Sequence, residues 1–522
     1  MLSSHAGCLR APAWRRLSLT CLAPLLVLSI SASPALGQAR PTAAVSAELR
    51  SAMGGKLKAF YRARAWWPLW IQGDTLGPEA DRLIALIESS DLDGLDPADF
   101  DPEDLRDVVE VARSGSPEAL ARAEVRLSRA FAAYVRALRR APTVKMVYLD
   151  QELVPEQPTE IEVLRAAGVE TSMAAYVDTM GWMNPIYAQL RARLVDYHEN
   201  WSGLPEIVLP PGPTLRSGMK GERVALLRER LGLAPGAGFD KPLAAKLKAF
   251  QAAHGLPADA VAGAKTLAAL NRGSAWYEHL LRLNLERARV LPGTRKRYVV
   301  VDAAAARLWL YEDGAVVDTM KVIVGKPTEP TPMLAGMMRY AVVNPYWNVP
   351  PDLVRKRIVP RVVENGESLN AMGYEALSDW THDARILDQS EIDWTAVAAG
   401  SQELRVRQLP GKTNSMGKMK FMFPNDLGIY LHDTPEKALF KQEGRRFSSG
   451  CVRVEDAQRL ALWLFGKPLD APSEAPEQQV YLPQPVPVYI TYMTAAPTDT
   501  GIAFREDAYE RDAAQTEQFA GR

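Results

Sequence analysis

Two residues near the C-terminal end of the chain have the side-chain types that nucleophilic catalysis needs. Cys451 stands in the string FSSGCVRV (residues 447–454), and His432 ends the short β-forming string IYLH (residues 429–432). A thiol paired with an imidazole supplies a nucleophile together with the base that takes its proton. We therefore interpret Cys451 as a reactive thiol, against the alternative of a cysteine that is a small buried apolar residue.

The residues around Cys451 favour a thiolate. An apolar-periodic stretch, Ala457–Phe465, predicts a helix whose N-terminus lies just after the cysteine, where partial positive charge stabilises a thiolate. Gly450 lets the backbone approach a substrate closely. Three cations are close in sequence: Arg445, Arg446 and Arg453. Of the histidines after residue 37, only His432 ends a β-run that leads into the cysteine loop.

The N-terminal 37 residues are predicted to be a cleaved export signal. An apolar stretch from about Leu17 to Ile30 follows three arginines, and Ala35-Leu36-Gly37 supplies the small residues before the cleavage point. The alternative is an uncleaved membrane anchor, although the stretch is short for a bilayer span. Removal of residues 1–37 takes away Cys8 and Cys21, so a periplasmic mature chain would keep only Cys451 and form no internal disulfide.

Length and composition limit the number of domains and the kinds of partner that the rest of the chain can have. The 522 residues predict about three domains. Lys plus Arg equals Asp plus Glu at 62 each, so no net charge favours nucleic acid as a partner. After the signal no segment is apolar enough to cross a membrane, which predicts no stable membrane span once the signal is removed. The sequence contains no metal-ligand cluster, and we expect no cofactor.

Pattern divides the mature chain into a helical and a β-rich half. Residues 45–203 are helix-rich, and the Pro-rich string 209–213 separates them from a small helical unit at 214–272. Residues 297–493 are mostly β, with an insertion at about 346–408 whose length suggests a lid. Residues 494–522 are read as a C-terminal tail. The predicted fold is therefore a multidomain α+β arrangement.

The Cys451 and His432 motifs resemble those of the L,D-transpeptidase catalytic domain of the YkuD type. That family has a histidine followed downstream by Ser/Thr-X-Gly-Cys, matched here by YLHDTP and SSGCVRV. Long, YcbB-type members also carry a helical scaffold, a peptidoglycan-binding domain and a lid. Two further stretches, NPYWNVP (344–350) and RQLPG (407–411), are similar to these members. Ser449 stands where many shorter relatives have histidine.

The resemblance implies roles for individual residues. Cys451 would attack the third residue of a tetrapeptide stem, His432 would take the thiol proton, and the Asp433 backbone carbonyl would orient the imidazole. Gly450 and Cys451 backbone N–H groups would hold the oxyanion, with Tyr430 as an extra donor. The acyl group would pass to a diaminopimelate-type amine, giving a 3-3 cross-link, and carbapenems would acylate the same thiol. Residues predicted to contact substrate or support the loop are Arg453, Ser449, Trp347 and Tyr346.

Residues 214–272 resemble a three-helix peptidoglycan-binding domain. The similarity rests on fold and turn positions that run from Gly221 to Asn271, including Phe250-Gln251 and His254-Gly255-Leu256. One departure is Ala260, where the family usually has glycine after the aspartate. His254 is interpreted as a satisfied surface or turn histidine.

Other functions remain open at this point. Water in place of the amine acceptor would make the enzyme an L,D-carboxypeptidase, and a chain without activity would be a wall-binding protein. The strings Ser217–Lys220 and Ser415–Lys418 fit the Ser-x-x-Lys pattern of penicillin-binding serine enzymes, but no Lys-Thr-Gly accompanies them. A zinc peptidase is disfavoured because no His-Glu-x-x-His occurs.

Overall fold

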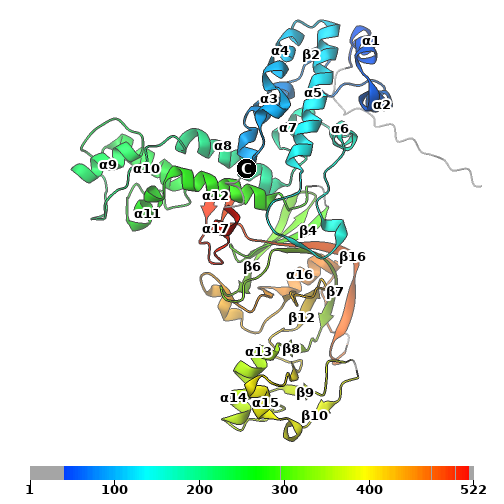
Figure 1. The fold of residues 1–522 in the computed structure, drawn as a ribbon, viewed down its shortest axis with the longest axis vertical. Coiled ribbons are helices and arrows are strands. Elements are labelled where there is room, and N and C mark those ends of the chain that lie inside the picture. The colour runs from blue at the N-terminus through cyan, green and yellow to red at the C-terminus, as the bar shows by residue number, and fades with distance from the viewer. Residues whose placement is uncertain (1–39, 294–295, 382, 472, 500, 517–522) are drawn as a thin grey trace, which may run out of the picture.

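The computed structural model describes residues 40–293, 296–381, 383–471, 473–499 and 501–516. The predicted signal at 1–37 lies outside these residues. Figure 1 shows a helical body at one end, a helical arm to one side, a central sheet and a small lobe at the far end. The prediction of a multidomain α+β fold, with a helical N-terminal region and a mostly β C-terminal domain, is confirmed.

The helical body is built around one long helix, α5 (Pro117–Leu138). Its start is fixed by the Ser116 side chain, which accepts from the Ala119 N–H, and by Pro117 in the first turn, where no N–H is needed. Its apolar face is buried against its neighbours. These are α1 (Ala43–Ala52), α2 (Gly55–Ala63), α3 (Glu79–Glu88), α4 (Pro102–Ala112), α6 (Glu160–Gly168) and α7 (Met173–Asp178), with the hairpin β1 (Ile71–Gln72) and β2 (Thr75–Leu76) and three single 3-10 turns, η1 (Ser90–Asp93), η2 (Pro97–Phe100) and η3 (Gln151–Leu153).

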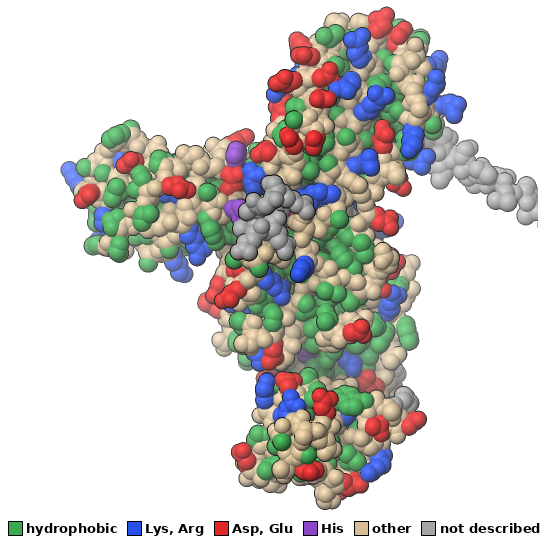
Figure 2. Space-filling view, in the orientation of Figure 1, with side chains coloured by type: hydrophobic (Ala, Val, Ile, Leu, Met, Phe, Trp, Pro, Cys, Tyr) green, Lys and Arg blue, Asp and Glu red, His purple; other side chains and the backbone are tan. Residues whose placement is uncertain are grey.

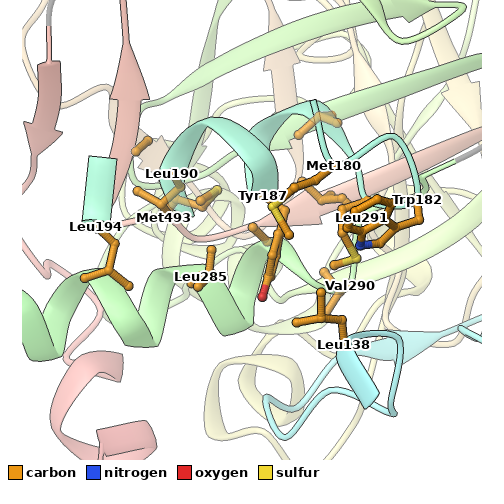
Figure 3. Close-up of a cluster of buried hydrophobic side chains, with 14 of the residues drawn as sticks. Leu138, Met180, Trp182, Tyr187, Leu190, Leu194, Leu285, Val290, Leu291 and Met493 are labelled. Carbon is orange, nitrogen blue, oxygen red and sulfur yellow. The ribbon is translucent and has the colours of Figure 1, made fainter. Parts of the chain in front are cut away.

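Two long helices connect the body, the arm and the sheet. α8 (Pro185–Trp201) and α12 (Ser274–Ala288) lie side by side, and the arm between them holds α9 (Glu222–Arg230), α10 (Lys241–Ala253) and α11 (Ala264–Arg272). Figure 3 shows Leu138, Leu190, Leu285 and Met493 in a single apolar cluster, although they come from four separate segments. The units therefore share one continuous core.

The central sheet closes on itself. Its strands are β4 (Arg297–Asp302), β5 (Arg307–Glu312), β6 (Ala315–Gly325), β7 (Leu334–Val343), β12 (Met419–Met422), β13 (Leu431–His432), β15 (Val452–Val454) and β16 (Gln478–Thr491). β7 pairs with β16 along one edge and with β12 along the C-terminal half of the other edge. β3 (Val147–Tyr148) from the helical half pairs with the N-terminal half of that second edge. The short strand β14 (Arg446–Ser448) pairs with β6, and η6 (Lys437–Lys441) and α16 (Ala457–Phe465) lie between strands.

The insertion between β7 and β12 is a lobe with a core of its own. Its sheet has the order β10-β9-β11-β8, and twelve buried apolar side chains form a cluster separate from the main core. Figure 2 shows the lobe set off by a waist, with side chains of both charges beside it. Its elements are β8 (Trp347–Val349), α13 (Pro351–Leu353), the π-turn η4 (Val354–Ile358), α14 (Val359–Val363), β9 (Tyr374–Leu377), β10 (Ile386–Leu387), η5 (Gln389–Glu391), α15 (Trp394–Ala399) and β11 (Arg405–Gln408).

The described part of the predicted C-terminal tail is folded. β17 (Ala495–Thr498) and β18 (Gly501–Phe504) form a hairpin, and α17 (Arg511–Thr516) packs on α12. The hairpin also contacts the arm, where the carbonyl of Ile502 lies against Gly255.

Candidate active site

Strand register brings four of the predicted site residues to one face of the sheet. β13 and β15 run parallel, with Leu431 opposite Val452 and His432 opposite Arg453. Continuing the pairing by one residue places Tyr430 opposite Cys451, and the Val452 N–H donates to the Tyr430 carbonyl at 3.1 Å. Because side chains alternate along a strand, Tyr430, His432, Cys451 and Arg453 project from the same face.

The His432 imidazole is held in one orientation. It is 2% exposed, and its Nδ1 lies 2.6 Å from the Asp433 carbonyl oxygen. Since a carbonyl can only accept, Nδ1 carries the proton and Nε2 keeps the free lone pair. Burial, followed by the positive charge of Arg453, lowers the pKa of His432 to about 3. The ring is therefore neutral at pH 7 and able to act as a base.

The Asp433 side chain fixes the backbone that holds this carbonyl. Its Oδ2 accepts the Lys418 N–H at 2.9 Å, and its Oδ1 lies 2.7 Å from the Lys437 ammonium. The side chain therefore anchors the turn, while the backbone oxygen contacts the ring.

The Cys451 thiol is partly buried and donates to the Gly428 carbonyl at 3.3 Å. Burial raises the pKa of Cys451, whereas hydrogen bonds from the Tyr430 backbone and hydroxyl and the charge of Arg453 act in the opposite direction. Burial and the neighbouring cysteine also raise the pKa of Tyr430, so its hydroxyl stays protonated and remains a donor. The resting site is a neutral thiol beside a neutral imidazole.

Two expectations about the thiolate are wrong. The predicted helix is confirmed as α16 (Ala457–Phe465), but strand β15 separates its N-terminus from Cys451, and the dipole effect fades within the first turn. Arg445 donates instead to the carbonyls of Val322, Ala305 and Ala306, and Arg446 pairs with Glu506. Of the three arginines, only Arg453 acts on the pKa of Cys451.

The loop that carries the nucleophile depends on a glycine. Gly450 has φ +110°, which a residue with a side chain rarely adopts, and an added Cβ would approach Ile429 at 3.1 Å. The Gly450 N–H donates to Ser448 Oγ at 3.2 Å, and Ser448 Oγ donates to the Cys451 carbonyl at 2.5 Å. The predicted oxyanion role of the Gly450 amide therefore requires it to exchange Ser448 for the substrate oxygen.

The remaining predicted residues lie around this centre. Arg453 forms an ion pair with Glu436, and Ser449 bonds to the Glu329 carboxylate. Tyr346 and Trp347 lie at the base of the lobe, where the Arg407 guanidinium stacks 4.0 Å from the Tyr346 ring centroid. The role of these two aromatic residues in substrate binding stays a prediction.

The sequence analysis missed the residues that reach the nucleophile loop from a distance. The Gly428 carbonyl accepts a hydrogen bond from the thiol, and the Glu329 carboxylate bonds to Ser449. The buried Thr331 hydroxyl donates to the Gly450 carbonyl at 2.8 Å. The only sequence signal near Thr331 is the turn-rich string GKPTEPT (residues 325–331), which does not predict a partner.

Comparison with known proteins decides the family of this region. Residues 296–471 match the L,D-transpeptidase catalytic-domain family. They form an L,D-transpeptidase catalytic domain. Residues 55–194 match a scaffold domain, and residues 223–270 match a putative peptidoglycan-binding domain. The L,D-transpeptidase and peptidoglycan-binding resemblances predicted from sequence are thereby confirmed.

Individual relatives of the L,D-transpeptidase domain cover part of the chain. A putative L,D-transpeptidase of Haemophilus influenzae is 34% identical over 181 residues, which is 35% of this chain and 36% of that protein. An L,D-transpeptidase from Mycobacterium smegmatis is 15% identical, over 37% of this chain and 58% of that one, with a TM-score of 0.19. An L,D-transpeptidase from Xylanimonas cellulosilytica is 17% identical, over 54% of this chain and 99% of that one, with a TM-score of 0.15. Scores this low add nothing on the fold.

The peptidoglycan-binding unit has a buried histidine and a strained turn. His254 lies in the turn that ends α10, in agreement with the prediction of a surface or turn histidine, although at 4% exposure it is not on the surface. Its satisfied state is confirmed by bonds to Tyr197 and Phe250. Ala260 adopts φ +60°, the left-handed conformation for which the family uses glycine. The turn is kept because the Ala260 N–H donates to Gln251 Oε1 at 2.9 Å.

Within the described ranges, no group of three or more His, Cys, Asp or Glu side chains could hold a metal ion. Over the same residues, no helix is both long and apolar enough to cross a bilayer.

Proposed function

We propose that the protein is an exported, periplasmic L,D-transpeptidase that forms 3-3 cross-links between peptidoglycan stem peptides through a Cys451 acyl-enzyme. The observation that carries the proposal is the register of β13 and β15, which places His432, Tyr430 and Arg453 on the face of Cys451. This face belongs to a domain that matches the L,D-transpeptidase family. A peptidoglycan-binding unit in the same chain supports the choice of substrate.

In the first half-reaction, His432 Nε2 takes the thiol proton as Cys451 Sγ attacks the carbonyl carbon of the third residue of a tetrapeptide stem. The Cys451 N–H and the Tyr430 hydroxyl hold the negative oxygen. As the C–N bond breaks, the imidazolium returns its proton to the leaving amine of D-Ala. A thioester to Cys451 remains.

In the second half-reaction, the side-chain amine of a diaminopimelate-type residue in another stem attacks the thioester. His432 takes a proton from the amine and gives it to the departing thiol, so the new amide bond forms and the enzyme returns to its resting state. Burial keeps His432 neutral, which is the form that both steps require.

We propose that the lobe at 346–408 closes over the donor stem. Its first π-turn carries Lys356, whose charge acts on Glu329, the partner of Ser449 beside the nucleophile. Hydrogen exchange in the lobe is expected to slow on acylation, and unchanged protection would remove the lid proposal.

The deciding experiment is mass analysis of muropeptides after incubation of purified tetrapeptide donor with the protein. A dimer joined through a 3-3 bond, together with free D-Ala, is the expected product. Tripeptide and D-Ala without a dimer would instead indicate an L,D-carboxypeptidase. Unchanged tetrapeptide, with a thiol that a carbapenem does not acylate, would indicate a wall-binding protein without activity.

A further inference from the structure

Thr331 joins a neighbouring loop to the backbone of the nucleophile loop. Its side chain lies in the interior, with 0% of the residue exposed. Its hydroxyl accepts the Gly325 N–H at 2.9 Å and donates to the Gly450 carbonyl oxygen at 2.8 Å. The Gly325 N–H occupies one side of the oxygen and the hydroxyl gives its proton to the Gly450 carbonyl, while the Tyr509 hydroxyl also bonds to the Thr331 side chain.

The Gly450 carbonyl belongs to the same peptide unit as the Cys451 N–H. A trans peptide is planar, so its C=O and N–H groups point in opposite directions. A hydroxyl that fixes the direction of the carbonyl also fixes the direction of the amide. Gly450 has φ +110° and no Cβ, and Ser448 bonds only the flanking groups, the Gly450 N–H and the Cys451 carbonyl, so the Thr331 hydroxyl is the bond that acts on this peptide unit directly.

Two residues of the C-terminal segment bond to the backbone of the loop that carries Thr331. The Tyr509 hydroxyl donates to the Gly325 carbonyl at 2.6 Å, and Arg511 Nη2 donates to the Thr331 carbonyl at 2.9 Å. Both residues follow the last residue of the catalytic-domain match at 471. They belong to the part of the chain whose sequence predicted only a tail.

This segment is itself fixed to the domain. The Tyr509 ring stacks on Tyr492 of the central domain at 4.9 Å, and the Tyr509 N–H donates to the Tyr492 hydroxyl at 3.0 Å. The Arg511 guanidinium lies over both rings, and Asp512 forms an ion pair with Arg287 of α12 at 2.7 Å. Tyr509 and Arg511 therefore act from a rigid support.

We propose that Thr331 is a positioning residue that aims the Cys451 N–H at the developing oxyanion, and that Tyr509 and Arg511 extend this control to the C-terminal segment. The proposal rests on the proposed acyl transfer. Thr331 does not contact the thiol or the imidazole, so its effect is confined to stabilisation of the tetrahedral intermediate.

The first test compares Thr331→Val, which removes the donor at nearly constant shape, with Thr331→Ser, which keeps it. Removal of an oxyanion donor costs about 10²–10³-fold in rate, and a misdirected donor should cost at least about tenfold. We expect Thr331→Val to lower kcat for acylation with little change in KM, and Thr331→Ser to remain within about threefold of the parent. Tyr509→Phe should give a smaller loss in the same parameter.

Alkylation by iodoacetamide is the control, because it needs the thiolate and passes through no oxyanion. Its rate and pH profile should be the same in Thr331→Val and the parent. A general disturbance of the site would slow alkylation and acylation together, and that result would overturn the proposal. Equal losses in Thr331→Ser and Thr331→Val would also overturn it, because the hydroxyl would then not matter.

A second measurement does not depend on the reaction. In the full chain with Cys8→Ser and Cys21→Ser, Cys451 is the single cysteine, so ¹⁵N-cysteine labelling gives one amide resonance. This resonance should move in Thr331→Val and stay nearly in place in Thr331→Ser; an unmoved resonance in Thr331→Val would refute the positioning role. If the parent forms no acyl-enzyme while the resonance behaves as expected, the proposed function fails, and what stands is that Thr331 sets the direction of the Cys451 N–H.

Discussion

Two buried histidines, His432 in the catalytic domain and His254 in the peptidoglycan-binding unit, are alike in their burial, their lowered pKa and the partner of Nδ1. Burial lowers the pKa of His432 to about 3 and that of His254 to about 4. Each places Nδ1 on a backbone carbonyl, at 2.6 Å for Asp433 and 2.7 Å for Phe250. A low pKa and a fixed tautomer therefore do not identify a catalytic histidine.

The two histidines differ in what surrounds the rest of the ring. His254 Nε2 lies 3.1 Å from the Tyr197 hydroxyl, and its ring stacks on Phe250 with the centroids 3.8 Å apart. Its second ring nitrogen therefore also has a partner in the core. His432 shares its face of the sheet with Cys451, and its ring makes an edge-to-face contact with Tyr430, with the ring centroids 5.8 Å apart. The two histidines therefore differ in their neighbours: only His432 shares a sheet face with a thiol, and the proposed mechanism depends on that thiol.

Replacement of the nucleophile should give the largest effect. Cys451→Ser should abolish cross-linking although the hydroxyl is close in shape, because a serine hydroxyl ionises far less readily than a thiol. Muropeptide analysis with a tetrapeptide donor measures the product, and the variant should stay monodisperse and keep its binding to sacculi. Full 3-3 product from this variant would overturn the assignment of Cys451.

The two histidines can be compared directly by the same substitution. His432→Ala should slow acylation by about 10²–10⁴-fold, since it removes the general base. His254→Ala should leave turnover of soluble stems within about twofold. It should instead lower the free energy of unfolding by about 2–4 kcal/mol, because it opens a cavity beside Phe250. Stopped-flow acylation and urea unfolding separate the two; loss of catalysis in His254→Ala would remove the distinction.

Acid should destabilise the protein through both histidines. Their pKa values in the folded protein lie below the ordinary value of 6.5, so the unfolded chain binds more protons as pH falls below about 6.5. Each ring then removes up to about 1.4 kcal/mol of stability per pH unit, until the pH approaches its folded pKa. His254→Phe cannot take up this proton and should flatten the loss between about pH 6 and pH 4. Urea unfolding at several pH values measures the slope; an unchanged slope would contradict the low pKa of His254.

The smallest effect concerns the turn beside His254. Ala260 has a left-handed backbone, which glycine adopts without strain. Ala260→Gly should therefore raise the free energy of unfolding by up to about 1 kcal/mol, reduced by the greater freedom of glycine in the unfolded chain. Thermal unfolding measures the change, with Ala245→Gly, at an exposed position inside α10, as a matched control that should destabilise by about 1 kcal/mol. A loss of stability in both variants would show that the turn is not strained.

The sequence predicted best those features that depend on residues close together in the chain. The helical and β-rich halves and the Cys451–His432 motifs could be read from periodicity and from two short strings. The supports of the nucleophile could not, because Thr331 and Tyr509 act through backbone carbonyls that any residue can offer. The helix after Cys451 has its predicted bounds, Ala457–Phe465, but the strand Val452–Val454 that separates it from the thiol was missed, because three residues carry too little periodic signal.

The pairing of β3 with β7 makes the catalytic domain dependent on chain that precedes it by more than a hundred residues. The Val147 and Leu149 N–H groups donate to the carbonyls of Met333 and Ala335, and Asp150 accepts the Met337 N–H. An expression fragment that begins near residue 296 would leave this stretch of β7 as an open edge, ready to pair with another molecule. Such a fragment should aggregate or dimerise through that edge, and inhibitor screens that use it would sample a surface that the whole enzyme keeps covered.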